Sequence, residues 1–216
     1  MEREDAWDRA LQFVVKSDMQ GDVCEFGCYR GRSLSFLHKR SLEIEGQWRT
    51  RSIGRFFAFD SFEGMPALEE EDVLEGYNYA LGRLRPGRAA CSEEEFRTNL
   101  EAADFDLSRL TVVKGFYADS LARPETAALM QGARCALLHI DCDFESSAAA
   151  ALEFIEPYLQ DGCVVLFDDW FLFRGRPDKG VRHAFETWLP GSGYTASHYF
   201  HYAWCGNAFI LHEKDR

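Results

Sequence analysis

Two pairs of aspartates stand where an apolar run gives way to polar residues. Asp141 and Asp143 follow one run, and Asp168 and Asp169 follow another. Carboxylate oxygens are the ligands that Mg²⁺ prefers, and crowded carboxylates repel one another unless a cation lies between them. We therefore predict that Asp141, Asp168 and Asp169 hold Mg²⁺ or another divalent cation. For Asp168 and Asp169 alone, a turn and helix cap at a strand end would be an equally good explanation.

Asp143 is the candidate general base. A hydroxyl group that binds a metal ion becomes more acidic, and a nearby carboxylate can then take its proton. Asp143 stands two residues after Asp141, so both side chains share one face if the strand continues. A carboxylate that only supports the metal ligands is the alternative. His139 is the second candidate, because a neutral imidazole is a ready base near pH 7.

A turn with two glycines follows an earlier apolar run, in the sequence Glu25-Phe26-Gly27-Cys28-Tyr29-Arg30-Gly31. Gly27 and Gly31 would let the backbone approach a ligand, and Glu25 would repel a phosphate but attract an amine. This pattern suits the amino-acid end of S-adenosylmethionine. A nicotinamide cofactor would favour a G-x-G-x-x-G turn that holds pyrophosphate. A tight turn without a ligand is the plainer alternative.

Asp60 ends the next apolar run. A carboxylate at this place is the expected acceptor for the two ribose hydroxyls of such a cofactor, although a helix N-cap would also explain it. Glu25 and Asp60 together favour the cofactor interpretation more than either residue does alone.

The elements that must position these residues are short apolar runs separated by amphipathic stretches. This alternation is typical of parallel strands that helices bury on both faces. The predicted parallel strands are Asp22–Phe26, Arg55–Phe59, Leu110–Lys114, Ala136–Ile140 and Cys163–Phe167. A helix over Val181–Leu189 is expected to break at Pro190-Gly191, and the strands Tyr194–His201 and Asn207–His212 are expected to pair antiparallel.

The predicted fold class is therefore α/β, with a doubly wound, Rossmann-like sheet of seven strands. The sheet is mostly parallel and ends in an antiparallel C-terminal hairpin. Open parallel sheets bind ligands beyond the carboxyl ends of their strands. The predicted site residues stand at those ends.

Composition narrows the partners. With 216 residues, 46% of them apolar, residues 1–216 are expected to form a single domain. The net charge of −12 argues against binding to nucleic acid or an anionic membrane, and no apolar run reaches the roughly 20 residues of a membrane span. The seven cysteines show no zinc spacing, so we expect free thiols in the cytoplasm. A small molecule is the expected partner, and a homo-oligomer stays open.

Two loops are candidate lids over the site. Residues 65–92 carry Tyr77, Tyr79 and Arg83, and residues 170–179 carry Phe171, Phe173 and Arg174. Aromatic and arginine side chains could stack on a planar or sugar ring. Solvated loops of this composition are common as well.

Several motifs together resemble one known family. The most specific are Asp60-Ser61-Phe62-Glu63-Gly64 and the paired acidic motifs. The resemblance continues over residues 21–27, 60–66, 96–100, 114–121, 140–146, 162–170 and 180–185. In these segments the chain resembles the macrocin-type O-methyltransferases, which act on sugars of natural products.

The resemblance implies a class I methyltransferase that depends on S-adenosylmethionine and transfers a methyl group to a hydroxyl of a small molecule. It also favours Asp143 as the base. The residues that would line the cofactor are Glu25, Gly27, Asp60, Ser61, Phe62, Glu63, Gly115 and Phe116. Phe116 would pack against the adenine.

The chain departs from the family pattern at the acidic motif. The usual Asp-Gly-Asp-x-Tyr appears as Asp141-Cys142-Asp143-Phe144-Glu145, and His139 stands where the family commonly has a basic residue. The acceptor therefore stays open between a sugar hydroxyl and a catechol-like phenol. A nicotinamide-dependent oxidoreductase and a non-catalytic module that binds S-adenosylmethionine are the competing functions. The chain lacks the glycine turn that a nicotinamide-dependent oxidoreductase would need. A non-catalytic binding module would have no need of the four aspartates.

Overall fold

The computed structural model describes residues 1–75 and 84–215 and contains a seven-stranded sheet with the order β3-β2-β1-β4-β5-β7-β6. The strands are β1 (Gly21–Phe26), β2 (Ile53–Asp60), β3 (Leu110–Lys114), β4 (Cys135–Ile140), β5 (Leu159–Phe167), β6 (Tyr194–Tyr202) and β7 (Gly206–Glu213). β1 to β5 pair in parallel, and β7 is antiparallel to both β5 and β6. The predicted fold class is confirmed. The strand order reverses between β1 and β4, where open α/β sheets bind ligands.

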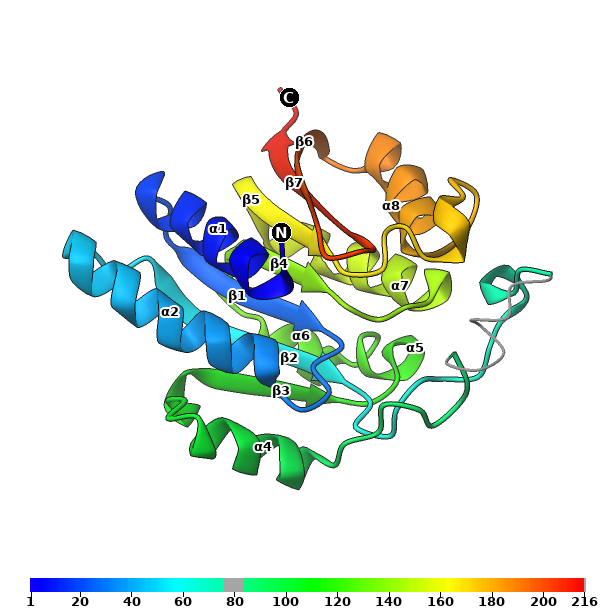
Figure 1. Ribbon diagram of the computed structural model, residues 1–216, viewed down its shortest axis with the longest axis horizontal. Coiled ribbons are helices and arrows are strands. Elements are labelled where there is room, and N and C mark those ends of the chain that lie inside the picture. Colours follow the sequence, from blue (N-terminus) through cyan, green and yellow to red (C-terminus); the bar gives the residue numbers. More distant parts are fainter. Residues whose placement is uncertain (76–83, 216) are drawn as a thin grey trace.

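Helices cover both faces of the sheet (Figure 1). One face carries α1 (Arg3–Lys16), α2 (Arg32–Trp48) and α4 (Glu93–Ala102), and the other carries α5 (Tyr117–Ser120), α6 (Pro124–Leu129), α7 (Glu145–Ile155) and α8 (Gly180–Gly191). Short 3₁₀ turns lie at η1 (Glu70–Asp72), η2 (Leu107–Arg109), η3 (Glu156–Tyr158) and η4 (Phe173–Gly175). Each helical layer buries its own hydrophobic core against the sheet.

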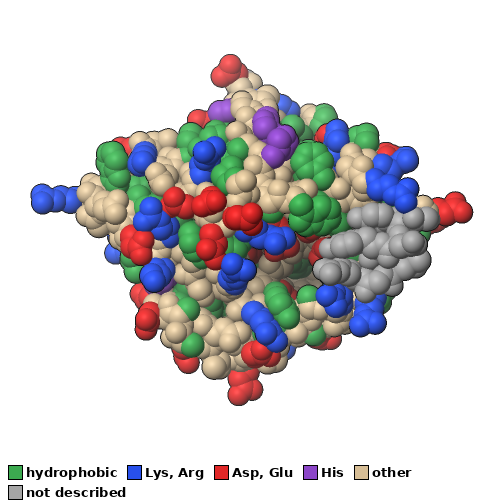
Figure 2. Space-filling model, in the orientation of Figure 1, with side chains coloured by type: hydrophobic (Ala, Val, Ile, Leu, Met, Phe, Trp, Pro, Cys, Tyr) green, Lys and Arg blue, Asp and Glu red, His purple; other side chains and the backbone are tan. Residues whose placement is uncertain are grey.

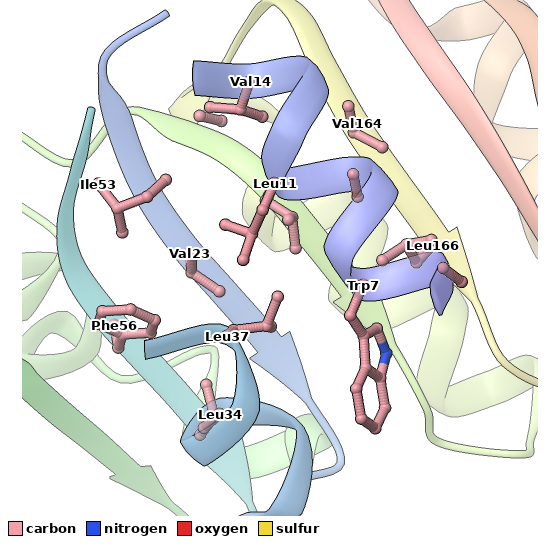
Figure 3. Close-up of a cluster of buried hydrophobic side chains, with 14 of the residues drawn as sticks. Trp7, Leu11, Val14, Val23, Leu34, Leu37, Ile53, Phe56, Val164 and Leu166 are labelled. Carbon is pink, nitrogen blue, oxygen red and sulfur yellow. The ribbon is translucent and has the colours of Figure 1, made fainter. Parts of the chain in front are cut away.

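The core under α1 matters most for the site, because this helix lies across β4 and β5. Trp7, Leu11 and Val14 are spaced by about one helical turn and point toward the sheet, where they pack with Val164 and Leu166 of β5 (Figure 3). This apolar stripe fixes the orientation of α1. The first turn of the helix, which carries Arg3, thus lies at the carboxyl edge of the sheet.

The sequence prediction included no specific helix at α1. The signal was present, because buried residues recur along α1 at helical spacing: Ala6, Trp7, Ala10, Leu11, Val14 and Val15. The charged residues between them mask this spacing. They lie on the solvent side of the helix.

The predicted break of the last helix was placed too early, because α8 continues through Pro190 to Gly191. Pro190 lacks the N–H that would bond the carbonyl oxygen of Glu186, and only Gly191 follows it in the helix, so no further turn is disturbed. Lys214 also donates to the carbonyl oxygens of Leu189 (3.4 Å) and Pro190 (3.1 Å), which satisfies acceptors of the last turn.

Acidic and basic side chains are interspersed over the face of the molecule shown in Figure 2. Within residues 1–75 and 84–215, no helix is long and apolar enough to cross a membrane.

Gly27 joins two loops at the carboxyl edge of the sheet. Its φ of +88° lies in the left-handed region, and a Cβ atom there would lie 1.8 Å from the carbonyl oxygen of Asp141. The turn after β1 and the loop after β4 are therefore in backbone contact. Only glycine allows this approach without moving one of them.

We expect Gly27→Ala to lower the free energy of unfolding by roughly 2–4 kcal/mol, because it combines an unfavourable φ with a backbone clash. The matched control is Gly46→Ala in α2, where a Cβ would meet nothing within 4 Å. That change should stabilise the helix by about 0.5–1 kcal/mol. Urea unfolding of both variants checks the pair, and equal stabilities would contradict the contact described above.

Candidate active site

Three carboxylates meet at the carboxyl ends of β4 and β5. Ile140 and Phe167 are partners in these neighbouring strands, so Asp141 and Asp168 emerge side by side, and Asp169 follows. Oxygen atoms of Asp141, Asp168 and Asp169 lie within 4.8 Å of one another. Two oxygens on opposite sides of a Mg²⁺ ion are about 4.2 Å apart. The three aspartates thus have the donor type and nearly the spacing of a Mg²⁺ site.

The electrostatics of this cluster favour a cation. Burial and the neighbouring carboxylates raise the pKa of Asp141 and of Asp169 well above the ordinary aspartate value. Deprotonating both in the folded protein therefore costs free energy. A divalent cation between them would offset this cost, so the residues fit a metal ion.

Asp168 differs from its two neighbours because a protein cation already contacts it. Arg3 of α1 donates from Nε to Oδ1 (2.8 Å) and to Oδ2 (2.9 Å), and from Nη2 to Oδ2 (2.5 Å). The Asp168 side chain is 3% exposed and that of Arg3 is 44% exposed. No sequence motif points to this pair, since 165 residues separate the partners.

Asp143 lies in the loop between β4 and α7, and its φ of +59° shows that the strand does not persist beyond its predicted end at Ile140, so the condition for a shared face with Asp141 is not met. Its backbone N–H donates to Oδ2 of Asp169 (3.2 Å), and the residue lines the cavity described below. Burial and the charge of Asp168 raise the pKa of Asp143 to about 6. A carboxylate with this pKa is largely ionised at neutral pH and is more basic than an exposed aspartate.

Glu25 and His139 form a buried pair rather than parts of the cavity wall. They are partners in neighbouring strands, their side chains are 0% exposed, and Nδ1 of His139 lies 2.7 Å from Oε1 of Glu25. Ser33 donates to the same oxygen. The sequence analysis predicted Glu25 as a contact of the cofactor and His139 as a candidate base, and both roles would require contact with a ligand. Side chains alternate across a strand, and the parity of Glu25 and His139 directs them to the face under α1.

Burial alone would lower the pKa of the His139 imidazole. The hydrogen bond and the negative charge of Glu25 outweigh this lowering, and the negative charge of Asp141 raises the pKa further. The pKa of His139 is therefore about 9. His139 is therefore an imidazolium at neutral pH. A protonated histidine is a poor general base, so this pKa favours Asp143 over His139 as the candidate base.

Asp60 ends β2 and holds the glycine turn in place. Its Oδ2 accepts from the backbone N–H groups of Cys28 (2.7 Å) and Tyr29 (2.9 Å), and its Oδ1 accepts from that of Phe62 (2.7 Å). Oδ2 already accepts two of these bonds, whereas Oδ1 accepts one and keeps a lone pair for a ribose hydroxyl. Asp60 lines the cavity.

A cavity of about 330 Å³ lies beyond the ends of β1, β2 and β4, which is a size typical of small-molecule sites. Of the predicted site residues, its wall contains Gly27, Asp60, Ser61, Phe116, Asp141 and Asp143. Residues that the sequence prediction missed include Tyr29, Met65, Arg88, Tyr117, Cys142 and Ser146. Tyr29, Tyr117 and Cys142 lie within the motifs quoted above, although no role was predicted for them. Arg88 lies in the candidate lid 65–92 and in no motif.

Other predicted cofactor residues lie outside this wall. Gly31 is the N-cap of α2 with a φ of +79°, and a side chain there would meet Leu100 at 2.8 Å. Phe62 is buried against the ring of Phe96, with 5.3 Å between the ring centroids. Glu63 is exposed, and Gly115 adopts a φ of +136° in the turn before α5. These four residues shape the loops around the cavity.

The two candidate lid segments contact each other and α7. Asp72 of η1 is fully buried and accepts from the N–H of Glu145 (2.7 Å) and from Oγ of Ser146 (3.1 Å). It therefore caps the N-terminus of α7 from a distant segment. Lys179 donates to the carbonyl oxygen of Glu71 (2.8 Å). Tyr77, Tyr79 and Arg83 lie outside the described residues.

The strand order, the antiparallel β7 and the cavity at the end of β1 together define the fold of the class I methyltransferases. The family model for macrocin-O-methyltransferase (TylF) matches residues 1–188. The chain belongs to this family, so the resemblance read from its motifs is confirmed.

Individual relatives agree with this assignment. A Streptomyces olivaceus protein, 8-demethyl-8-(2,3-dimethoxy-alpha-L-rhamnosyl)-tetracenomycin-C 4'-O-methyltransferase, is 28% identical over 177 residues, which are 79% of this chain and 60% of that protein. The chain thus spans less than two thirds of that relative's length. The structure of the O-methyltransferase NovP matches with a TM-score of 0.75 and 20% identity, over 98% of this chain and 80% of NovP. The structure of the calicheamicin methyltransferase CalS11 matches with a TM-score of 0.70 and 23% identity, over 96% of this chain and 77% of CalS11.

The His139 proton should make the stability of the metal-free protein depend on pH. Its folded pKa of about 9 lies above the ordinary value of 6.5, so the stabilisation is complete below pH 6.5 and is lost as the pH rises through 9. We expect wild type to lose up to about 3 kcal/mol between these pH values relative to His139→Gln. The measurement is urea unfolding with chelator at pH 6 and pH 9. The same pH dependence in both proteins would contradict an imidazolium at His139.

Proposed function

We propose that the protein is an S-adenosylmethionine-dependent O-methyltransferase that uses a divalent cation and acts on a hydroxyl group of a small molecule, most specifically a sugar. The observation that carries the proposal is the position of the aspartate cluster beside the cavity. Asp141 belongs to both, so a ligand in the cavity would lie against the cluster. Membership of the macrocin-O-methyltransferase family supports the same reaction.

Gly27, Asp60, Ser61 and Phe116 are the proposed contacts of the cofactor. The left-handed Gly27 lets the backbone approach the ligand, and Asp60 offers the remaining lone pair of its Oδ1 to the ribose. Phe116 lies in the cavity wall and would pack against the adenine. Glu25 acts from behind the wall, where its hydrogen bond with His139 ties β1 to β4.

Asp141, Asp168 and Asp169 are the proposed metal ligands. When bound, S-adenosylmethionine supplies an electrophilic methyl group, and the cation orients and acidifies the acceptor hydroxyl. Asp143 receives the hydroxyl proton as the new bond forms. Its backbone N–H bond to Asp169 keeps the base beside the metal ligands. The buried setting keeps water from competing with the acceptor.

The proposed acceptor is a sugar hydroxyl. The Streptomyces olivaceus relative is named for methylation at the 4' oxygen of a rhamnosyl group, and CalS11 is described as a TDP-rhamnose 3'-O-methyltransferase. The segments 65–92 and 170–179, proposed as substrate loops of a single domain, would select the acceptor. Arg88 lies in the cavity wall on the first of them and could donate to sugar hydroxyls.

The competing functions fit less well. A nicotinamide-dependent oxidoreductase would need a phosphate-binding glycine turn, and the turn after β1 has instead Glu25 before it and the carboxylate of Asp60 hydrogen-bonded to it. A non-catalytic binding module gives no reason for a cluster that burial makes costly to ionise. Family membership favours neither function.

Asp60→Ala should weaken the binding of S-adenosylhomocysteine by about 1–3 kcal/mol, because it removes a charged hydrogen-bond acceptor. Calorimetry gives the affinity. The control is Glu101→Ala, because Glu101 is exposed on α4 and does not line the cavity. An analogue without the two ribose hydroxyls separates a ribose contact from a displaced loop. The analogue should lose affinity for wild type but not for Asp60→Ala. Additive losses would contradict the ribose contact.

Asp143→Asn should lower kcat for methyl transfer by roughly 10²–10⁴ with little change in cofactor or metal affinity, since a base acts in the transition state. The assay is the mass gain of one methyl group on TDP-rhamnose and related sugars, with S-adenosylmethionine and Mg²⁺. Excess chelator should abolish turnover of wild type while cofactor binding persists.

The outcomes of this assay separate the roles. Loss of metal affinity in Asp143→Asn would make the residue a ligand instead of a base. A full rate in chelator, with bound metal shown to be absent, would remove the cation from the reaction. If no acceptor gains a methyl group although the cofactor binds, the binding-module interpretation gains support.

A further inference from the structure

Asp168 is the metal-ligand candidate that the protein itself neutralises. Both of its oxygens accept hydrogen bonds from the guanidinium of Arg3, at 2.8, 2.9 and 2.5 Å. Asp141 and Asp169 have no side-chain contact of this kind with a cation in the described parts of the chain. Arg3 therefore distinguishes one carboxylate of the cluster from the other two.

The contact joins a buried anion to a cation with access to solvent. Asp168 is 3% exposed, so its charge needs a partner in every state of the protein. Arg3 is 44% exposed, and the helix that carries it is anchored separately by the apolar side chains of Trp7 and Leu11. The Arg3 side chain can thus turn away into water without unfolding α1.

A guanidinium and a divalent cation at this edge would need the same oxygens. Oδ2 of Asp168 accepts two hydrogen bonds from Arg3 and Oδ1 accepts one, so a cation that coordinates Asp141 and Asp169 reaches Asp168 only at an oxygen whose electrons Arg3 already shares. Two positive charges would also repel each other at this distance. Simultaneous full occupation of Asp168 is therefore unfavourable.

We propose that Arg3 is a built-in counter-ion that competes with the divalent cation for Asp168 and thereby lowers the affinity of the site for metal. This inference rests on the proposed function, in which the three aspartates bind a cation. In the metal-free protein Arg3 keeps Asp168 paired. When a cation binds, the Arg3 side chain gives up Asp168 and turns toward solvent. Arg3 is a positioning residue in this scheme, because it acts through Asp168.

The test is Mn²⁺ binding, followed by the electron paramagnetic resonance signal of free Mn²⁺, with no acceptor or cofactor present. Arg3→Gln should bind Mn²⁺ about tenfold more tightly than wild type, since it removes the competitor. Arg3→Lys keeps the charge but has fewer donors for Asp168, and its affinity should lie between the two.

Arg9→Gln is the matched control, because Arg9 lies on the same helix and contacts the ring of Phe200 instead of Asp168. It removes the same charge from α1, and its Mn²⁺ affinity should stay within about twofold of wild type because solvent screens the more distant charge. Equal gains in Arg3→Gln and Arg9→Gln would show a general charge effect and overturn the competition.

The remaining outcomes are also decisive. An unchanged or weaker affinity in Arg3→Gln, with the far-ultraviolet circular dichroism of wild type, overturns the proposal for Arg3 and leaves the metal site standing. If none of the proteins binds Mn²⁺, the metal role and the competition fall together. Calorimetry with S-adenosylhomocysteine then decides separately whether the cofactor part of the proposed function survives.

Discussion

Negative charge buried at the carboxyl ends of β4 and β5 is the constraint on which the rest of the site depends. Three carboxylates lie within 4.8 Å of one another, and burial penalises the ionised forms of Asp141 and Asp169. The protein compensates part of this charge with Arg3 from α1 and with the His139 imidazolium from β4. The two cations act from different elements. The part that Arg3 contributes is present only when α1 is docked on the sheet.

This dependence explains why two polar pairs lie inside a helix–sheet interface that is otherwise apolar. Glu25 keeps His139 protonated through a hydrogen bond of 2.7 Å, and both side chains lie under α1 beside Trp7. A buried ion pair contributes little net stability, but breaking it leaves an uncompensated charge. The pair thus couples the positions of β1, β4 and α1. Glu25, which precedes the glycine turn after β1, thus acts on the aspartate cluster through the charge of His139 and not through the wall of the cavity.

Strands could be predicted from the sequence because buried parallel strands produce continuous apolar runs, such as Leu110–Lys114, whose bounds are the same in the structure. The carboxylates at strand ends could be predicted because parallel strands finish at one edge. Three features could not. The side of the sheet that Glu25 faces depends on strand parity relative to α1, the loop conformation of Asp143 depends on a φ of +59°, and Arg3 meets Asp168 only in the tertiary structure.

The backbone contact between Gly27 and Asp141 links the two halves of the proposed reaction. The N–H of Asp141 donates to the carbonyl oxygen of Phe26 (2.8 Å), and the N–H of Gly27 donates to that of Phe59 (2.9 Å), so the ends of three strands are tied together. A cofactor held by the glycine turn and an acceptor held at the aspartates would then be neighbours, with no domain movement required to join them. The cost is that any residue larger than glycine at position 27 displaces an aspartate as well as the cofactor turn. The proposed cofactor turn and the proposed metal ligands therefore cannot change position independently.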